Sequence, residues 1–288
     1  MVFKMSLFQP SELMQFLESI GQKPSKRLSQ NFLIDGNILK KILAASSIDP
    51  GDLVIEIGPG PGVLTEALLQ AGASVVAIEK DVVFADALAR LRTPGKTLAI
   101  YKQDVLTFPF ETFLKEHLKP GQKGKIISNL PYHLTSPIFD RILPLHSYIE
   151  KVVVMVQKEV ADRIVARHGT KDMSSFSIFC QFYSDPSFLF SVSPNCFFPK
   201  PKVTSAVVSC YLKQPISSIN TEAFFKMIRI CYSARRKMLT TSLKEVCPQE
   251  MILKALREQD LKETARPEEL SIENWLLLFH QLKNFFSL

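Results

Sequence analysis

Few cysteines and no long apolar run occur in this sequence, and both absences restrict its class. The five cysteines are odd in number and widely scattered, and no two of them are spaced as CxxC. The pattern predicts neither a disulfide framework nor a zinc site. No apolar stretch reaches the roughly 18 to 20 residues of a membrane span, and the first residues mix charged and polar side chains with proline rather than forming a signal peptide. We expect a soluble, cytoplasmic protein that binds neither a metal nor a membrane.

A large charge imbalance is also missing. The chain has 35 lysines and arginines against 28 aspartates and glutamates, a formal net charge of +7 at pH 7. An excess of this size favours an anionic partner but is shared by many enzymes. At 288 residues the chain is long enough for one large domain and a small one, and it shows no internal repeat or low-complexity segment.

Strand and helix patterns alternate through the middle of the chain. Apolar, partly β-branched runs predict five strands, at 53–57, 74–79, 98–102, 125–128 and 151–156. Helical patterns at 63–70 and 82–91 separate the first three strands. This alternation predicts an α/β fold with a doubly wound, mostly parallel sheet. Two further strands, at 188–192 and 203–212, would close one edge as an antiparallel pair and bring the sheet to seven strands.

The pattern changes near Pro215, after which no strand is predicted. Helical spacing and helix-forming composition predict three helices there, at 223–231, 249–258 and 272–285. Two more helices precede the first strand, at 11–20 and 37–46. A basic, polar stretch at 22–30 separates those two. We therefore expect a Rossmann-like domain at 1–215, with an N-terminal helical and basic extension, and a small all-helical domain at 216–288.

A glycine-rich loop follows the first predicted strand. Residues 58–62 have the sequence Gly-Pro-Gly-Pro-Gly, which permits a tight turn and lets a ligand approach the main chain. The spacing is GxGxG rather than the GxGxxG of dinucleotide-binding loops, and the two prolines have no N–H to offer a phosphate. S-adenosylmethionine has no phosphate, so such a loop suits it better. Taken alone, the loop could also be only a tight turn.

Three acidic residues lie near the ends of neighbouring predicted strands. Glu56, just before the loop, can bind the methionine ammonium directly or through water. Glu79 ends the second strand, where it can accept both ribose hydroxyls. Asp104 follows the third strand, where it can accept from the adenine amino group. An acid after a strand is often only a helix cap, but the order of loop and acids predicts a cofactor site that includes Gly58 and Gly60.

Asn129, Leu130, Pro131 and Tyr132 follow the fourth predicted strand. The Asn129 side-chain oxygen and a main-chain carbonyl near Leu130 can each accept a hydrogen of an adenine amine and aim its lone pair at a methyl donor. Tyr132 would stack on a base that has left its helix. In isolation the same run predicts only a strand-end turn with a core tyrosine. The adjacent His133 is not needed as a base, because no proton must be removed before the transfer.

Basic residues in three places are candidates for phosphate contacts, although a solvated helix face is the usual explanation for such runs. The candidates are Lys23, Lys26, Arg27, Lys200, Lys202, Arg235, Arg236 and Lys237. The residues alone leave Phe197 open, because it and Phe198 could simply pin a loop against the core.

Taken together, these motifs resemble those of the small-subunit ribosomal RNA adenine N6,N6-dimethyltransferases, nearly from end to end. The resemblance is carried by Gln30 to Leu33, Glu56 to Thr65, Glu79, Gln103 with Asp104, Asn129 to Tyr132, Thr135 to Pro137, Gln157 to Glu159, and Phe197, Pro199, Pro201, Lys202, Val203 and Ser205. One departure is Ser29, where the family usually has glycine.

The resemblance implies roles for residues that their spacing leaves open. Asn31 and Leu33 would contact S-adenosylmethionine, as would Asn129, and Phe197 would hold the target base opposite Tyr132. The expected reaction transfers four methyl groups to two adjacent adenosines in a hairpin near the 3′ end of small-subunit RNA. We expect the substrate to be the assembling small subunit, a pre-30S particle, and the enzyme to be a monomer.

Three other functions are compatible with part of these motifs. A sister enzyme methylates a 23S large-subunit adenine and confers macrolide resistance, but the run Thr135, Ser136 and Pro137 favours the small-subunit family. A ribosome assembly or transcription factor could keep the fold and lose catalysis, against which the intact acids and Asn129 argue. A dehydrogenase is the most distant alternative.

Overall fold

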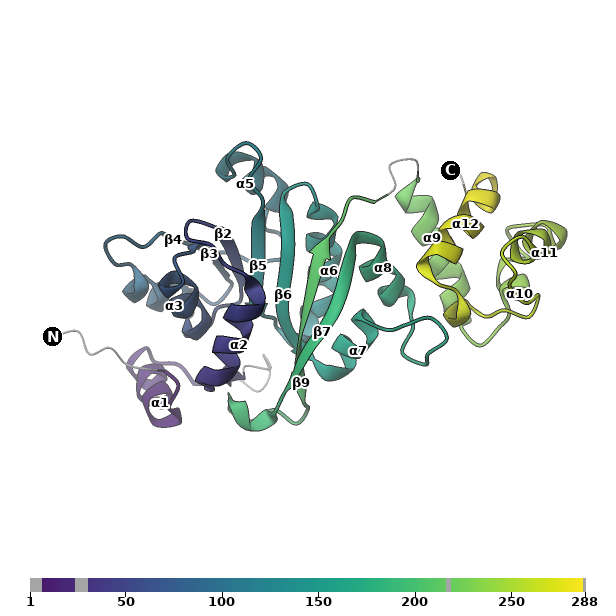
Figure 1. Cartoon of the computed structure of the whole chain (residues 1–288). Coiled ribbons are helices and arrows are strands. Elements are labelled where there is room, and N and C mark those ends of the chain that lie inside the picture. Colours follow the sequence, from purple (N-terminus) through teal and green to yellow (C-terminus); the bar gives the residue numbers. More distant parts are fainter. Residues whose placement is uncertain (1–6, 24–30, 216–218, 287–288) are drawn as a thin grey trace. The chain divides into compact units, whose positions relative to one another are not determined.

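The computed structural model describes residues 7–23, 31–215 and 219–286 (Figure 1). The contacts divide the chain into two compact units. The first contains the chain up to Ala161 together with Ser184–Lys213, and the second contains Asp162–Tyr183 together with the chain from Gln214 onward. The boundary expected near Pro215 lies two residues from Lys213, but the structure also assigns Asp162–Tyr183 to the second unit.

A seven-stranded sheet forms the centre of the first unit, in the order β4-β3-β2-β5-β6-β9-β7. The first five strands in that order are parallel to one another, and β9 is antiparallel to both β6 and β7. The strands are β2 (Leu53–Ile57), β3 (Ser74–Glu79), β4 (Leu98–Lys102), β5 (Gly124–Asn129), β6 (Ile149–Gln157), β7 (Ser184–Val192) and β9 (Ser205–Leu212). The predicted mostly parallel sheet and its antiparallel edge pair are confirmed.

Helices cover both faces of this sheet, with α2 in front and α6 behind in Figure 1. Because both faces are covered, the strands β2, β3 and β6 are buried almost without interruption, which is typical of parallel sheets. The helices are α1 (Pro10–Ser19), α2 (Gly36–Ser46), α3 (Val63–Gln70), α4 (Val82–Ala87), α5 (Phe110–His117), α6 (Thr135–Ile142) and α7 (Lys158–Ile164), in which the unit boundary falls. A 3₁₀ turn at Leu88–Leu91 extends α4, and α5, α6 and α7 were not predicted.

The chain reverses its direction of travel across the sheet between β2 and β5. From β2 it proceeds through β3 to β4, and β5 then returns to the other side of β2. In open α/β sheets, ligands bind beyond the carboxyl ends of the strands at such a switch point. The glycine-rich loop after β2 and the Asn129 run after β5 are therefore brought to the same place.

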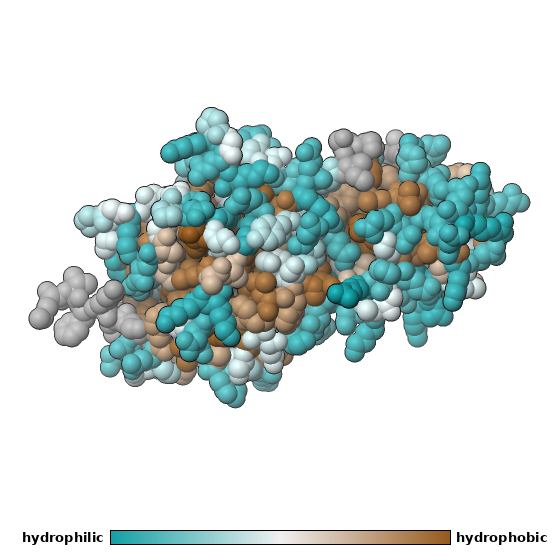
Figure 2. Space-filling model, viewed as in Figure 1, coloured by the Kyte–Doolittle hydropathy of each residue, from teal (hydrophilic) through white to brown (hydrophobic). Residues whose placement is uncertain are grey.

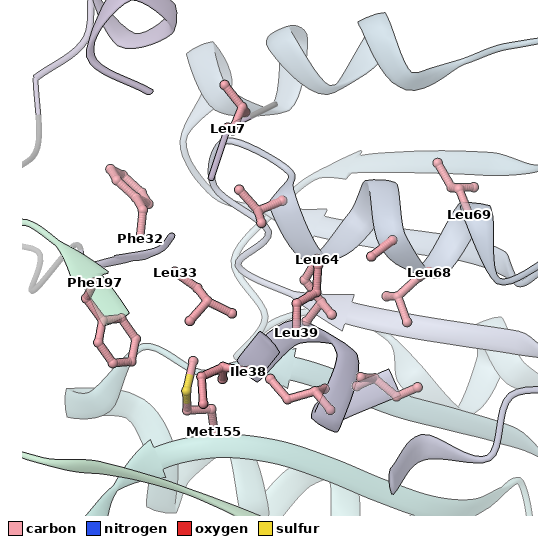
Figure 3. Packing of buried hydrophobic residues seen from close by; sticks show 14 of the residues in the cluster. Leu7, Phe32, Leu33, Ile38, Leu39, Leu64, Leu68, Leu69, Met155 and Phe197 are labelled. Atoms are coloured by element: carbon pink, nitrogen blue, oxygen red, sulfur yellow. The ribbon is translucent and has the colours of Figure 1, made fainter. Parts of the chain in front are cut away.

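A second, two-stranded sheet lies among the apolar residues that pack on the α2 and α3 side. Strand β1 (Phe32–Leu33) pairs antiparallel with β8 (Phe197–Phe198), so that Leu33 lies opposite Phe197. Both belong to the hydrophobic cluster that contains Met155 of β6 (Figure 3). Neither strand was predicted, because two residues are too few to show an alternating pattern.

The second unit is built from helices. Its helices are α8 (Ser175–Tyr183), α9 (Thr221–Ser233), α10 (Leu239–Leu243), α11 (Gln249–Arg257) and α12 (Ile272–Leu282). Trp275 and Phe224 are fully buried, and the Phe224 ring stacks on Phe182 of α8 with centroids 5.2 Å apart. The predicted small all-helical domain is confirmed, with α8 and α10 as additions. On the face seen in Figure 2, the surface over α10 and α11 is mostly hydrophilic.

No helix in the described part of the chain is long and apolar enough to cross a membrane. Across the same residues, no group of three or more histidine, cysteine, aspartate or glutamate side chains is arranged to hold a metal ion.

A buried ion pair joins the start of β5 to the turn before β2. The Lys125 side chain is only 7% exposed, and its Nζ lies 2.6 Å from Asp52 Oδ2 and 3.3 Å from Glu150 Oε1. It also donates to the Ser47 carbonyl at the end of α2. Removing one partner of a buried pair leaves a charge with little compensation.

We expect Asp52→Asn to lower the free energy of unfolding by about 2–3 kcal/mol, because the Lys125 charge stays buried. Asp185→Asn is the matched control, since Asp185 pairs with Lys213 at 2.7 Å but both side chains are well exposed, and this change should cost less than about 1 kcal/mol. Urea unfolding followed by circular dichroism measures both. Equal losses would contradict this account of Lys125.

Candidate functional site

A cavity of about 420 Å³ opens in the first unit, at the carboxyl ends of β2, β3 and β5. The structure brings most of the predicted site residues to its wall. These are Asn31, Leu33, Glu56, Gly58, Gly60, Glu79, Asp104, Asn129, Leu130, Pro131 and Tyr132. Phe197 is absent from the described residues that line it.

The N–H groups of the glycine-rich loop are used within the protein. Gly58 N donates to the Ile78 carbonyl at 2.9 Å, Gly60 N to Glu79 Oε2 at 3.0 Å, and Gly62 N to the Pro59 carbonyl at 3.0 Å. Prolines occupy the two positions between them and have no N–H. This loop therefore offers no main-chain donor to a phosphate, unlike the loops that bind dinucleotides.

Close packing explains why the middle of this loop is glycine. Gly60 has a φ of 54°, and a Cβ there would lie 3.1 Å from a Phe32 ring carbon. Phe32 in turn packs edge to face against Phe84 of α4. At Gly58 a Cβ would lie 3.7 Å from Pro131. The glycine-rich loop thus lies close to both the 31–33 segment and the Asn129 run.

Glu79 is held by the main chain at both carboxylate oxygens. Oε2 accepts from Gly60 N and Oε1 from Asp81 N, at 3.0 and 2.9 Å. Burial raises the pKa of Glu79, and these hydrogen bonds oppose the rise. Each carboxylate oxygen has a second lone pair. Glu79 can therefore still accept hydroxyl groups from a ligand in the cavity.

Glu56 is the most deeply buried acid of the site. Its side chain is 2% exposed, and its Oε2 has no hydrogen-bond partner among the residues described. Burial raises the pKa of Glu56 to about 8; Thr65 opposes the rise and the Glu79 carboxylate adds to it. An unpartnered buried carboxylate is costly unless a cation or a donor comes to it. Glu56 is thus suited to an ammonium group.

Asp104 lies at the rim and is already paired. Its Oδ2 is 2.8 Å from Lys80 Nζ, and its Oδ1 accepts from Leu106 N at 2.9 Å. The Lys80 ammonium is the main cause that lowers the pKa of Asp104. Lys80 also lines the cavity and was not predicted. An adenine amine would therefore meet a carboxylate that Lys80 keeps ionised.

The orientation of the Asn129 amide follows from one neighbour. Asn129 Nδ2 donates to the Asn31 carbonyl at 3.4 Å. Since a carbonyl oxygen can only accept, the NH₂ group must face Asn31 and the amide oxygen must face away from it. Asn129 Oδ1 is buried and lacks a partner within the described chain. A buried acceptor without a donor is rare in a folded protein, and here it lies in the wall of the cavity.

Tyr132 is fixed at both ends. It opens a 3₁₀ turn (Tyr132–Leu134), and its carbonyl accepts from Thr135 Oγ1 at 3.2 Å. Its hydroxyl lies 2.5 Å from Ser205 Oγ at the start of β9. Burial raises the pKa of Tyr132, so the phenol stays protonated. Leu130 is buried beside it and donates its N–H to the Met155 carbonyl at 3.1 Å.

Phe197 lies in the apolar cluster described above and is 3% exposed. In this structure it packs with Leu33 and Met155 rather than lining the cavity (Figure 3). The strand pair β1–β8 also connects Phe197 to the 31–33 segment. The preceding residue, Cys196, donates from Sγ to Asp35 Oδ2 at 3.2 Å. The role of Phe197 toward a base stays a prediction.

The basic candidates lie in three different places. Lys23 is exposed, and Lys26 and Arg27 fall outside the described residues. Lys200 and Lys202 are exposed in the loop between β8 and β9. In the second unit, Arg236 and Lys237 are exposed after α9, whereas Arg235 is half-buried. The Arg235 Nε lies 3.8 Å from Glu268 Oε2, and its Nη2 donates to the Thr170 carbonyl. Arg235 thus has side-chain partners on the protein.

Sequence reasoning missed two contributors to the site. Lys80 directly follows Glu79, and its pairing with Asp104 depends on a contact 24 residues along the chain. Ser205 was among the residues that carry the resemblance, but no role was predicted for it. Its contact with Tyr132 joins residues 73 positions apart, which no local pattern reveals.

The order of the strands, the position of the cavity and its loop without phosphate donors define a Rossmann-like methyltransferase. Comparison with known proteins is more specific. The model of the family described as ribosomal RNA adenine dimethylase matches residues 21–284. The chain belongs to this family.

Individual relatives agree with that assignment. The chain is 49% identical over 278 residues to ribosomal RNA small subunit methyltransferase A of Protochlamydia amoebophila, covering 96% of this chain and 98% of that one. It is 44% identical over 283 residues to the Chlamydia caviae protein of the same name, covering 97% and 99%. Among solved structures, a dimethyladenosine transferase from Plasmodium falciparum has a TM-score of 0.74 at 25% identity, covering 88% and 98%. The 23S rRNA methyltransferase ErmE shares the fold, with a TM-score of 0.68 at 24% identity and coverage of 88% and 100%.

The raised pKa of Glu56 has a measurable effect on stability. Between its ordinary value of 4.5 and about 8, folded Glu56 binds more protons than it does in the unfolded chain, so this residue makes the protein less stable as the pH rises. We expect Glu56→Gln to remove that effect. The free energy of unfolding of wild type minus that of the variant should fall by about 1.4 kcal/mol per pH unit within this window.

Urea titrations at several pH values, without cofactor, test this expectation. Glu111→Gln, the same substitution at an exposed residue of α5, controls for the loss of a carboxylate. A difference between Glu56→Gln and wild type that does not change with pH would contradict the assigned pKa.

Proposed function

We propose that this protein transfers methyl groups from S-adenosylmethionine to N6 of two adjacent adenosines near the 3′ end of small-subunit ribosomal RNA, in an assembling particle. The single observation that carries the proposal is the buried, unpartnered Oδ1 of Asn129 in the cavity wall. An amine donor completes that acceptor. The family and the two relatives named small subunit methyltransferase A support the choice of RNA.

The residues of the cavity fit S-adenosylmethionine. The unpartnered carboxylate of Glu56 would hold the methionine ammonium, and Glu79 would accept the ribose hydroxyls. Asp104 would accept from the adenine amine, while Asn31 and Leu33 cover the ligand from the β1 side. The glycine-rich loop offers no donor to a phosphate, and S-adenosylmethionine has no phosphate group. When bound, the cofactor supplies a methyl group on a positively charged sulfur.

The Asn129 run would hold the amine that receives the methyl group. Asn129 Oδ1 and a main-chain carbonyl near Leu130 accept its two hydrogens, which directs the nitrogen lone pair toward the donor and stabilises the positive charge that develops. A Cβ at Gly58 would lie 3.7 Å from Pro131, so the donor loop and the acceptor run lie close together. Alignment of this kind supplies much of the rate enhancement.

No residue of the site has to act as a strong base. The phenol of Tyr132 is protonated, and His133 is exposed at the cavity wall. The proton of the methylated amine can pass to solvent after transfer. Tyr132 would instead stack on the target base, which must leave its helix to reach the cavity. We propose that Phe197 contacts this base from the opposite side once RNA has bound.

The basic residues would bind phosphates of the RNA. Lys200 and Lys202 lie in the loop that leads to Ser205, at the same edge of the sheet as the cavity. Arg236 and Lys237 present further positive charge on the second unit. We propose that the protein works as a cytoplasmic monomer on pre-30S particles, with Lys23, Lys26, Arg27 and Arg235 as additional contacts.

Asn129→Ala should lower methyl transfer by a hundredfold or more, on the order of the loss when one preorganised group at a reaction centre is removed. Binding to RNA should be nearly unchanged, because phosphate contacts dominate affinity. The assay incubates wild type and variant with labelled S-adenosylmethionine and under-methylated small or large subunits. Nuclease digestion and mass spectrometry then locate the product.

Two results would overturn the proposal. Wild-type label found only on large-subunit RNA would assign the protein to the macrolide-resistance type of activity, and the absence of label would leave an assembly factor. An equal loss of transfer and RNA binding in Asn129→Ala would mean that Asn129 is not an amine acceptor.

Lys200→Ala and Lys202→Ala should each weaken binding to small-subunit RNA and reduce the slope of log affinity against log salt by about 1. Lys213→Ala is the control, because Lys213 follows the opposite end of β9 and pairs with Asp185. Filter binding at several salt concentrations measures the slope. A loss of affinity with an unchanged slope would contradict a phosphate role.

A further inference from the structure

The geometry points to Ser205 as a positioning residue that holds the Tyr132 ring in the orientation required by the target base, an inference that rests on the proposed function. Ser205 is not a lining residue of the cavity among those described. It would act only through its hydrogen bond to Tyr132, whose hydroxyl lies 2.5 Å from Ser205 Oγ.

Tyr132 needs a second support, because its main chain belongs to a short turn. The turn after β5 is one 3₁₀ turn closed by the Leu134 N–H to the Pro131 carbonyl at 2.9 Å, with the Thr135 hydroxyl on the Tyr132 carbonyl. These contacts place the Cα atom. They leave the side chain free to swing about its first torsion angle.

Ser205 is a rigid anchor for the other end. It is the first residue of β9, and it is fully buried. In the sheet it lies opposite Gln157 of β6 on one side and Val192 of β7 on the other. A strand paired along both edges moves little compared with a loop, so its hydroxyl is held in a nearly fixed position.

The hydrogen bond orients the ring in two ways. It fixes the direction of the axis from Cβ to the hydroxyl oxygen, and therefore the first torsion angle. Because a phenolic O–H prefers the plane of its ring, the position of the partner also restricts rotation of the ring about that axis. A base stacked on Tyr132 would then have one defined plane rather than several.

Such control matters for the transfer step. The amine, the methyl group and the sulfur must be collinear, and a displacement of about 1 Å can cost a hundredfold in rate. Binding of the RNA, by contrast, rests mainly on phosphate contacts at a distance from the ring. Loss of Ser205 should therefore reduce kcat much more than it raises KM.

A purely structural role for Ser205 leads to different results. If the bond only stabilised the fold, its loss would lower the unfolding midpoint and would affect cofactor affinity and catalysis together. If Ser205 acts through the Tyr132 hydroxyl, removing either hydroxyl must have the same effect as removing both. Non-additivity shows that the two hydroxyls act as a unit, and an unchanged thermal midpoint and cofactor affinity then separate positioning from a structural role.

The experiment compares the full-length wild type with Ser205→Ala, Tyr132→Phe and the double variant on under-methylated small subunits. Ser209→Ala is the matched control, since Ser209 is a buried serine four residues further along β9, roughly 13 Å away at strand spacing. For each protein we would measure kcat, KM, the Kd for S-adenosylmethionine by calorimetry, and the thermal midpoint.

We expect each single variant to lose about tenfold or more in kcat, with KM and the Kd for S-adenosylmethionine nearly unchanged and Ser209→Ala equal to wild type. The double variant should be no slower than Tyr132→Phe. Full activity of Ser205→Ala, losses that multiply in the double variant, or a parallel loss of cofactor affinity would each overturn the inference. A wild type that methylates no small-subunit RNA would instead overturn the proposed function.

Discussion

The direction of one amide determines what this site can do. Asn129 ends β5, and its NH₂ group is turned toward the Asn31 carbonyl, which leaves its oxygen buried without a donor from the residues that the structure describes. Strand β5 lies next to β2 in the sheet, and β2 leads into the loop that would hold the cofactor. Because the carboxyl ends of adjacent parallel strands meet at one edge, the acceptor for an amine and the site of the methyl donor become neighbours. The two lie close together, since a Cβ at Gly58 would lie 3.7 Å from Pro131, and Phe32 leaves little room for a Cβ at Gly60.

Two buried acids suit the cavity to a ligand that brings them a cation or a hydrogen-bond donor. Glu56 and Glu79 are both buried, and burial raises the pKa of each. The main-chain N–H groups that would attract an anion are consumed inside the loop. A ligand with a positive charge and hydroxyl groups therefore finds partners here, whereas a phosphate finds none in the loop. The proposed cofactor and the excluded dinucleotide differ in these properties, so the same few residues explain the preference and the exclusion.

Much of this arrangement could be predicted because it depends on local signals. The strands β2, β3 and β4 and helix α3 have the predicted bounds, since buried runs of Val and Ile and a glycine-rich turn are visible within a few residues. Eleven of the twelve residues predicted for the cofactor and the amine line the cavity. Nine of them lie at or after the ends of strands that meet at one edge, whereas Asn31 and Leu33 were implied by the resemblance alone. Helix α8 was missed, because six of its nine residues are buried and it shows no polar face. The pairs Lys80 with Asp104, Ser205 with Tyr132 and Leu33 with Phe197 were missed because each depends on how distant segments pack.

The most direct test of this account is a crystal structure of the protein with S-adenosylhomocysteine and adenosine. We expect the adenosine N6 to donate to Asn129 Oδ1 at a distance of about 2.7–3.2 Å, with its ring on Tyr132 and with the ammonium of the cofactor product at Glu56. An Asn129 amide turned the other way, with its oxygen toward Asn31, would contradict the central claim. So would a nucleoside bound with its amine away from Asn129.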